Sequence, residues 1–139
     1  MTGKSATSIA ILGAGSWGTA VAIHLARQGH RVLLWSHDPK KASAIEKNRV
    51  NEQYLPGIQL ADTIHVSSSL TDTIDQCDEA IIAIPSHGFK SVISSLPSKL
   101  QRIAWLTKGI DPDSNRLLSQ CITDHFGNNV SMAVISGPS

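Results

Sequence analysis

The chain has 139 residues, a length that suits one domain with a sizeable core and is short for a two-domain enzyme. Hydrophobic residues make up 41% of the sequence and the formal net charge is +1, so no bulk charge favours nucleic acid or an anionic membrane. Aromatic residues, at 4%, are too few to form stacking platforms for single strands. We therefore expect no nucleic-acid partner.

The amino-terminal segment is expected to be neither a signal peptide nor a membrane span. Its first eight residues are polar, and the apolar run that follows is broken at Gly13. Cys77 and Cys121 lack CxxC spacing and are expected to be small core residues, and the six histidines show no metal-ligand spacing. We expect a reducing, cytoplasmic compartment and no bound metal.

A buried strand over residues 9–12 runs directly into a glycine-rich turn and then into a helix over 16–28. The turn has the spacing Gly13-x-Gly15-x-x-Gly18, and each glycine has its own task. Gly13 permits the tight turn, Gly15 lets a pyrophosphate approach the backbone, and Gly18 lets the helix lie close to the sheet. A diphosphate there would face free N–H groups and roughly half a positive charge at the helix start.

A nucleoside-triphosphate P-loop is excluded at this turn. Thr19 and Ala20 follow Gly18, where that motif requires lysine and then serine or threonine. The alternative to dinucleotide binding is an ordinary strand-to-helix turn that happens to be rich in glycine. We interpret the turn as a dinucleotide-binding site because of its place between a strand and a helix.

The next strand bears on which dinucleotide is bound. Gly29 ends the first helix, and a second strand is predicted over 31–36. An NAD-specific unit usually places Asp or Glu at the end of this strand, where the carboxylate accepts hydrogen bonds from the adenosine ribose. Here residues 35–37 are Trp-Ser-His, and the first carboxylate is Asp38, beyond the strand.

This missing acid favours NADP. No carboxylate at the strand tip repels a 2'-phosphate, and His37, Lys40 and Lys41 could attract one. We therefore favour NADP, as NADPH, while NAD or dual use stays open. In the alternative interpretation Asp38 merely caps a helix over 39–48 and both lysines are solvated.

The remaining predicted elements alternate between strands and helices. They are a loop over 51–60, a strand over 64–67, a short helix opened by a capping box at Ser69–Asp72, strands over 79–84 and 102–108, a helix over 116–126, and a strand over 132–136. This alternation predicts an α/β fold: a Rossmann doubly wound, mainly parallel sheet with strand order 3-2-1-4-5-6, formed by residues 1–139 as one NAD(P)-binding domain.

Ligands in such sheets bind outside the carboxyl ends of the strands, where the strand order reverses. Pro85 should stop the strand over 79–84, and Ser86 should cap the following helix, so residues 85–88 should line the same crevice as the glycine turn. We interpret His87 as a surface or cofactor-packing residue rather than a catalytic one.

The strand over 102–108 ends in Lys108, which should therefore project from its carboxyl end near the same crevice. A cation there could meet a phosphate or a polarised oxygen of a ligand, and such a charge-assisted hydrogen bond contributes about 1.5 to 3 kcal/mol. The alternative is an ordinary solvated lysine at a strand end.

Several short motifs together resemble those of the bacterial NAD(P)-dependent glycerol-3-phosphate dehydrogenases. They are GAGSWGTA at 13–20, LWSHDP at 34–39, YLPGI at 54–58, IPSH at 84–87, TKG at 107–109 and SGPS at 136–139. The resemblance covers this whole chain but only the amino-terminal half of the family. This chain has His37 where the family often has arginine.

The resemblance implies a cytoplasmic enzyme that reduces dihydroxyacetone phosphate to sn-glycerol 3-phosphate for phospholipid synthesis. By motif, the dinucleotide would contact Ser16, Trp17, His37 and Lys108, beside Gly13, Gly15, Gly18 and Pro85, and glycerol phosphate would contact Lys108, Gly137 and Ser139. The family's proton-donating lysine and the Arg-Asn pair that holds the substrate lie in an all-helical second domain absent from this chain. Lys108 would therefore have a supporting catalytic role.

The chain stops at a strand tip, where functional loops belong, and we therefore expect it to be part of a longer enzyme. We expect the full-length protein to be a homodimer. Two other functions stay open: a stand-alone NAD(P)-sensing module without chemistry, and a related reductase of another small keto or hydroxy acid.

Overall fold

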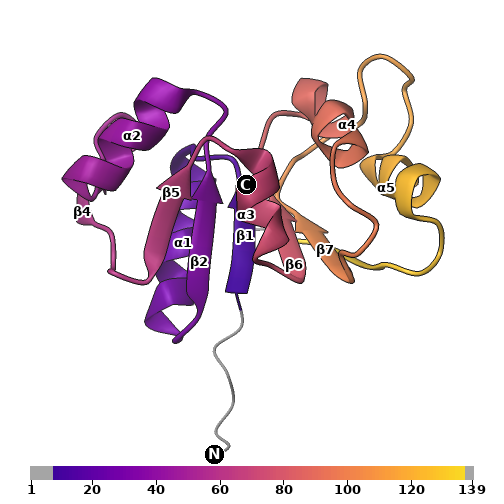
Figure 1. Ribbon diagram of the computed structural model, residues 1–139. Helices are drawn as coiled ribbons and strands as arrows, with labels where there is room; N and C mark the ends of the chain where they lie inside the picture. The colour runs from indigo at the N-terminus through magenta and orange to yellow at the C-terminus, as the bar shows by residue number, and fades with distance from the viewer. Residues whose placement is uncertain (1–7, 137–139) are drawn as a thin grey trace, which may run out of the picture.

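Helices cover both faces of a six-stranded sheet in the computed structural model, which describes residues 8–136 (Figure 1). The elements are, in chain order, β1 (Ser8–Leu12), α1 (Ser16–Arg27), β2 (Arg31–Trp35), α2 (Pro39–Asn48), β3 (Val50–Asn51), β4 (Leu55–Gln59), β5 (Ile64–Ser67), α3 (Leu70–Asp75), β6 (Glu79–Ile82), α4 (Ser86–Ser94), β7 (Arg102–Trp105), α5 (Leu118–Phe126) and β8 (Ser131–Val134). Strands β3 and β4 form a separate two-stranded sheet.

The main sheet has the order β5-β2-β1-β6-β7-β8, and each neighbouring pair is parallel. Counted among themselves along the chain, these strands have the order 3-2-1-4-5-6, so the predicted topology is confirmed. The register places Leu12 beside Trp35 and Ile82, and Ile82 beside Trp105. Four strands therefore end in one row across the sheet.

The apolar strands are buried because each face of the sheet meets a different set of helices. Successive side chains of a strand point to opposite faces. Ile9 and Ile11 belong to a core with residues of α1 and α2, whereas Ala10 and Leu12 belong to a core with residues of α3, α4 and α5. Figure 1 shows α2 beside β5, and α4 and α5 on the side of β6 and β7.

The sheet is less covered toward β8. All four residues of β8 are exposed, and Val134 has 62% of its surface open to solvent. Ile81, Ala104 and Ala133, which lie side by side on three adjacent strands, line an open groove on one face of the sheet. The core is therefore densest around β1, β2 and β6.

Of the three predicted helix caps, Asp38, Ser69 and Ser86, the first two agree with the structure. Asp38 caps α2 and accepts a hydrogen bond from the Lys40 N–H at 2.9 Å. Ser69 accepts from the Asp72 N–H at 3.2 Å, which is one half of the predicted capping box. The prediction that Ser86 caps α4 is wrong. Pro85 occupies that position, because its extended backbone places its own carbonyl at the first helical turn and Ser86 becomes the first helical residue.

Helix α5 begins at Leu118 rather than at Arg116, because the preceding segment closes on itself. Asp111 is buried and accepts hydrogen bonds from the Ser114 N–H at 3.0 Å and hydroxyl at 2.6 Å, which hold the pKa of Asp111 below its usual range. The Asp111 N–H donates in turn to the Arg116 carbonyl, at 2.9 Å. This closed turn keeps its backbone groups from starting a helix earlier.

The prediction of a plain loop over 51–60 is also wrong, because β3 and β4 pair there as an antiparallel hairpin. Val50 lies opposite Gln59, and Asn51 lies opposite Leu55. Pro56 and Gly57, which indicated a loop, lie within β4. This strand has only one neighbour in its sheet, so a residue without an N–H is tolerated there.

Both cysteines are buried and unpaired with each other, as expected of small core residues. Burial raises the pKa of the Cys77 thiol to about 11 and also raises the pKa of Cys121, so neither thiol supplies a reactive thiolate near neutral pH. None of the helices among residues 8–136 combines the length and the apolar character needed to cross a bilayer.

The contact between α1 and the glycine turn can be tested by adding one methyl group. A Cβ at Gly18 would lie 1.9 Å from the Gly13 carbonyl oxygen, whereas a Cβ at Gly15 has no atom within 4 Å. Helix propensity favours alanine over glycine by about 1 kcal/mol, but a clash with backbone costs about 1 to 3 kcal/mol or more. We expect Gly18→Ala to lower the urea midpoint of unfolding and Gly15→Ala to leave it unchanged. Equal midpoints in circular dichroism would contradict this packing.

Candidate functional site

The row of strand ends brings the predicted site segments to one edge of the sheet. Beyond the last paired residues the ladder continues for one more bond, from the Gly13 N–H to the Trp35 carbonyl at 3.0 Å and from the Ala83 N–H to the Leu12 carbonyl at 2.8 Å. The glycine turn, the end of β2 and the ends of β6 and β7 therefore lie along the same edge. This edge is where ligands bind in open α/β sheets.

The glycine turn has the geometry that a bound diphosphate requires. Gly13 has a φ of +131°, and a Cβ there would lie 2.3 Å from the Ala83 carbonyl oxygen, so only glycine fits between β1 and β6. At Gly15, which precedes α1, the space that a Cβ would occupy is open. The first N–H groups of a helix lack intrahelical partners, and the first turn of α1 has no acidic residue to compete with an anion. The turn can therefore hold a phosphate group.

Ser16 and Trp17, the first two residues of α1, are exposed. Trp17 has 64% of its surface open to solvent. The Ser16 hydroxyl donates a hydrogen bond to the Tyr54 carbonyl oxygen at 3.0 Å and so connects the helix start to the β3–β4 hairpin. The predicted dinucleotide contacts Ser16 and Trp17 are thus beside the open space at Gly15.

The end of β2 is followed by His37, Lys40 and Lys41, and its nearest carboxylate in sequence, Asp38, is engaged in a helix cap. Ser36 is buried and accepts a hydrogen bond from the Asp38 N–H, while Asp38 itself caps α2. His37 is exposed next to this end. The two lysines differ: Lys40 is exposed, whereas Lys41 lines a pocket and its Nζ lies 5.4 Å from the centre of the Tyr54 ring. The solvated alternative therefore fits Lys40 better than Lys41.

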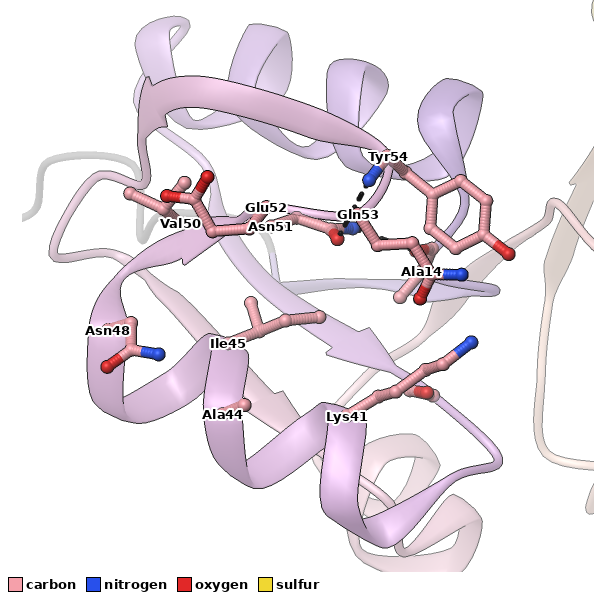
Figure 2. Close-up of a pocket in the computed structure, with 11 residues that line it drawn as sticks. Ala14, Lys41, Ala44, Ile45, Asn48, Val50, Asn51, Glu52, Gln53 and Tyr54 are labelled. Carbon is pink, nitrogen blue, oxygen red and sulfur yellow. Dashed lines mark hydrogen bonds between the residues drawn. The ribbon is translucent and has the colours of Figure 1, made fainter.

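A pocket of about 200 Å³ lies between α2, the hairpin and the glycine turn (Figure 2). Its lining residues are Ala14, Ser36, Lys41, Ala44, Ile45, Asn48, Val50, Asn51, Glu52, Gln53 and Tyr54. Pockets for complete small ligands usually measure about 300 to 1,000 Å³, so this one suits one end of a longer molecule. It adjoins both the glycine turn and the end of β2, as the adenosine end of a dinucleotide would require.

The hairpin residues of this pocket were missed by sequence reasoning. Asn51 and Tyr54 fall in a stretch with proline and glycine, where polar residues are ordinary, so no local signal separates them from a solvated loop. The YLPGI motif contributed to the family resemblance but carried no role for Tyr54. Their contribution becomes visible only once the hairpin is seen against the glycine turn.

The other predicted residues lie at the ends of β6 and β7. Pro85 and His87 are exposed at the start of α4, and no contact of His87 supports a catalytic role. The Thr107 hydroxyl donates to the Ile84 carbonyl oxygen at 2.6 Å and so connects the two strand ends, and Lys108 follows, exposed. Gly137 and Ser139, the other predicted substrate contacts, lie outside the described residues.

The basic residues of this edge lie outside the ion pairs of the described residues. In the part of the chain that the structure describes, the ion pairs are formed by Arg49 with Glu46, Arg102 with Glu79, and Arg116 with Asp124. Lys41, Lys108 and His37 take part in none of these pairs. Within residues 8–136, no group of three His, Cys, Asp or Glu side chains is placed to hold a metal ion.

Comparison with known proteins places this chain in a family. Residues 8–139 match the family described as NAD-dependent glycerol-3-phosphate dehydrogenase N-terminus. A glycerol-3-phosphate dehydrogenase [NAD(P)+] of Legionella pneumophila is 50% identical over 132 residues, which are 95% of this chain and 40% of that protein. The corresponding protein of Shewanella sediminis is 41% identical over 138 residues, 97% of this chain and 41% of the relative.

A solved structure agrees with the sequence matches. The crystal structure of glycerol-3-phosphate dehydrogenase from Coxiella burnetii superposes with a TM-score of 0.89 at 40% identity, over 96% of this chain and 42% of that one. The chain thus spans about 40% of the length of the relatives that it matches. From the family match and these identities, the chain belongs to the NAD-dependent glycerol-3-phosphate dehydrogenase family and corresponds to its amino-terminal part.

Proposed function

We propose that this chain is the dinucleotide-binding part of a glycerol-3-phosphate dehydrogenase that uses NADPH, or NADH, to reduce dihydroxyacetone phosphate to sn-glycerol 3-phosphate. The observation that carries this proposal is the open space at Gly15, directly before α1 and on the same sheet edge as Lys108. Relatives that carry this activity in their names match nearly the whole chain. That match favours an enzyme over a stand-alone sensing module.

The residues of the glycine turn bind rather than react. The N–H groups at the start of α1 would donate to the diphosphate, and the missing side chain at Gly15 would allow a close approach. When bound, the nicotinamide supplies the hydride that reduces the substrate carbonyl. Trp17 beside the turn and Pro85 after β6 are exposed and would contact the coenzyme.

Lys108 stabilises negative charge on the substrate. Reduction of a carbonyl places charge on its oxygen, and a nearby ammonium lowers the energy of that state. In this proposal Lys108, Gly137 and Ser139 contact glycerol phosphate, and Lys108 also contacts the dinucleotide. The proton comes from a lysine of an all-helical second domain, which also supplies an Arg-Asn pair that holds the substrate. We place the complete enzyme in the cytoplasm, as a homodimer that feeds phospholipid synthesis.

The preference for NADPH rests on charge at the end of β2. Asp38, the carboxylate that follows β2, is engaged in capping α2, and the carboxylate among the residues that line the adjoining pocket is Glu52 of the hairpin. Lys41 lines the adjoining pocket together with Ser36, and His37 is exposed beside it. A 2'-phosphate bound near Ser36 would therefore meet the ammonium of Lys41.

The binding role of Gly15 can be tested with a larger side chain. We expect wild-type chain to bind NADPH saturably in calorimetry and Gly15→Val to abolish that binding, because the side chain would occupy the path of the pyrophosphate. Gly15 has a φ of −82° and no atom near its missing Cβ, so valine should leave the fold intact. Ser43→Val, on the exposed surface of α2, is the matched control. Unaltered affinity in Gly15→Val, or no binding by the folded wild type, would contradict the proposal.

Lys41 should discriminate between the two coenzymes. A charge-assisted hydrogen bond contributes about 1.5 to 3 kcal/mol, so we expect Lys41→Ala to weaken NADPH binding about tenfold or more. NADH, which lacks the 2'-phosphate, should bind within about twofold of wild type. Lys47→Ala removes an exposed cation from the same helix and serves as the control. Equal losses for NADPH and NADH would show that Lys41 does not select the phosphate.

The role of Lys108 can be tested in a catalytically complete protein, such as a chimera in which residues 1–139 replace the matching part of the Legionella relative. We expect Lys108→Ala to lower turnover about tenfold or more, since a loss of about 1.4 kcal/mol of transition-state stabilisation already has that effect. Lys99→Ala, just before β7 at the opposite edge of the sheet, is the control. Wild-type kinetics in Lys108→Ala would identify Lys108 as a solvated lysine.

A further inference from the structure

Asn51 is a buried polar residue that joins the β3–β4 hairpin to the glycine turn. Only 2% of its surface is exposed. Its side-chain amide donates to the Ala14 carbonyl oxygen at 2.9 Å and to the Thr19 hydroxyl at 2.8 Å, and its oxygen lies 3.4 Å from the Tyr54 N–H. Figure 2 shows Asn51 beside Ala14 and Tyr54 at the edge of the pocket. The turn is therefore held by a residue 37 positions further along the chain.

The bond to Ala14 fixes the direction of the next N–H group. Ala14 and Gly15 share one peptide bond, and the peptide bonds of the described residues are trans. In a trans peptide the C=O and the N–H point in opposite directions. With the Ala14 oxygen held by buried Asn51, the Gly15 N–H must point away from the hairpin. Within residues 8–136 this N–H has no backbone acceptor, so it is free to donate to a ligand.

A glycine at position 15 makes this restraint necessary. Rotation of the peptide plane between Ala14 and Gly15 changes φ at Gly15, and glycine accepts either sign of φ at little cost. A flipped plane would turn the Ala14 carbonyl oxygen toward the diphosphate, where two negative groups repel. The missing side chain at Gly15 therefore makes room for the diphosphate but also lets this peptide plane rotate. The hydrogen bond from the Asn51 amide to the Ala14 oxygen opposes that rotation.

The hairpin is held at a second point. The Ser16 hydroxyl donates to the Tyr54 carbonyl oxygen at 3.0 Å, so the first residue of α1 and the turn before it both contact the hairpin. Thr19, the other partner of Asn51, is 1% exposed and lies one turn further along α1. The hairpin thus connects the two sides of the corner between β1 and α1.

We propose that Asn51 is a positioning residue, which acts through the Ala14 carbonyl to keep the Gly15 N–H directed at the diphosphate of the coenzyme. This inference rests on the proposed dinucleotide binding. The hairpin is then part of the binding site although it lies outside the main sheet. Asn51 itself does not contact the ligand in this scheme.

The test compares ADP, which carries the diphosphate without the nicotinamide, with NADPH in calorimetry. Asn51→Leu keeps a similar size but cannot donate to the Ala14 oxygen, and Asn51→Ala removes most of the side chain. We expect both variants to bind ADP and NADPH at least tenfold more weakly. Arg49→Gln is the matched control, because Arg49 holds the same hairpin through the Ala61 and Ile64 carbonyl oxygens and not through the glycine turn. It should bind within about twofold of wild type.

Nuclear magnetic resonance gives a second measurement, which a change in the stability of the fold alone would not alter. Addition of ADP should shift the Gly15 amide resonance, and this shift should be lost in Asn51→Leu but kept in Arg49→Gln.

If Asn51→Leu binds as well as wild type, or if Arg49→Gln loses as much affinity, the positioning role of Asn51 is wrong while dinucleotide binding stands. Should the Asn51 variants not fold, an unshifted Gly15 resonance in wild type bound to ADP would overturn the inference. A wild type that binds neither ligand overturns the proposed function as well.

Discussion

The close contact between the start of α1 and the end of β1 is the constraint on which the rest of the structure depends. Gly18 lies against the Gly13 carbonyl, and Gly13 lies against Ala83 at the end of β6, so three elements meet with no room for a side chain between them. This contact sets where α1 begins and directs its N–H groups to the edge at which β1, β2, β6 and β7 all end. The candidate site is a consequence of that packing.

The main sheet could be predicted from the sequence because its signals are local. The apolar run before Gly13, the stop at Gly29 and the Asp38 cap each depend on a few neighbouring residues, and the structure confirms all three. The strand order followed from right-handed crossovers and the usual doubly wound arrangement rather than from any single residue. The row of strand ends was then expected, and it brings the glycine turn and Lys108 to one edge.

The errors arose where distant contacts decide the structure. The β3–β4 hairpin depends on Asn51 finding Ala14 and Thr19, and no local pattern reports a bond across more than thirty residues. The start of α5 depends on the closed turn at Asp111, and that of α4 on the backbone of Pro85. Local propensity predicts whether such a segment is a loop, strand or helix, but not which distant residues it contacts. In this chain the contact that was missed, from Asn51 to the glycine turn, lies at the candidate site.

The sparse covering of β8 has a consequence for how such a fold can change. Within residues 8–136, β8 pairs with β7 alone, and its other edge presents unpaired backbone groups. Strands β6 and β7 separate that edge from the corner between β1 and α1. A further strand or helix can therefore pack beside β8 without contact with the corner between β1 and α1 that forms the candidate site.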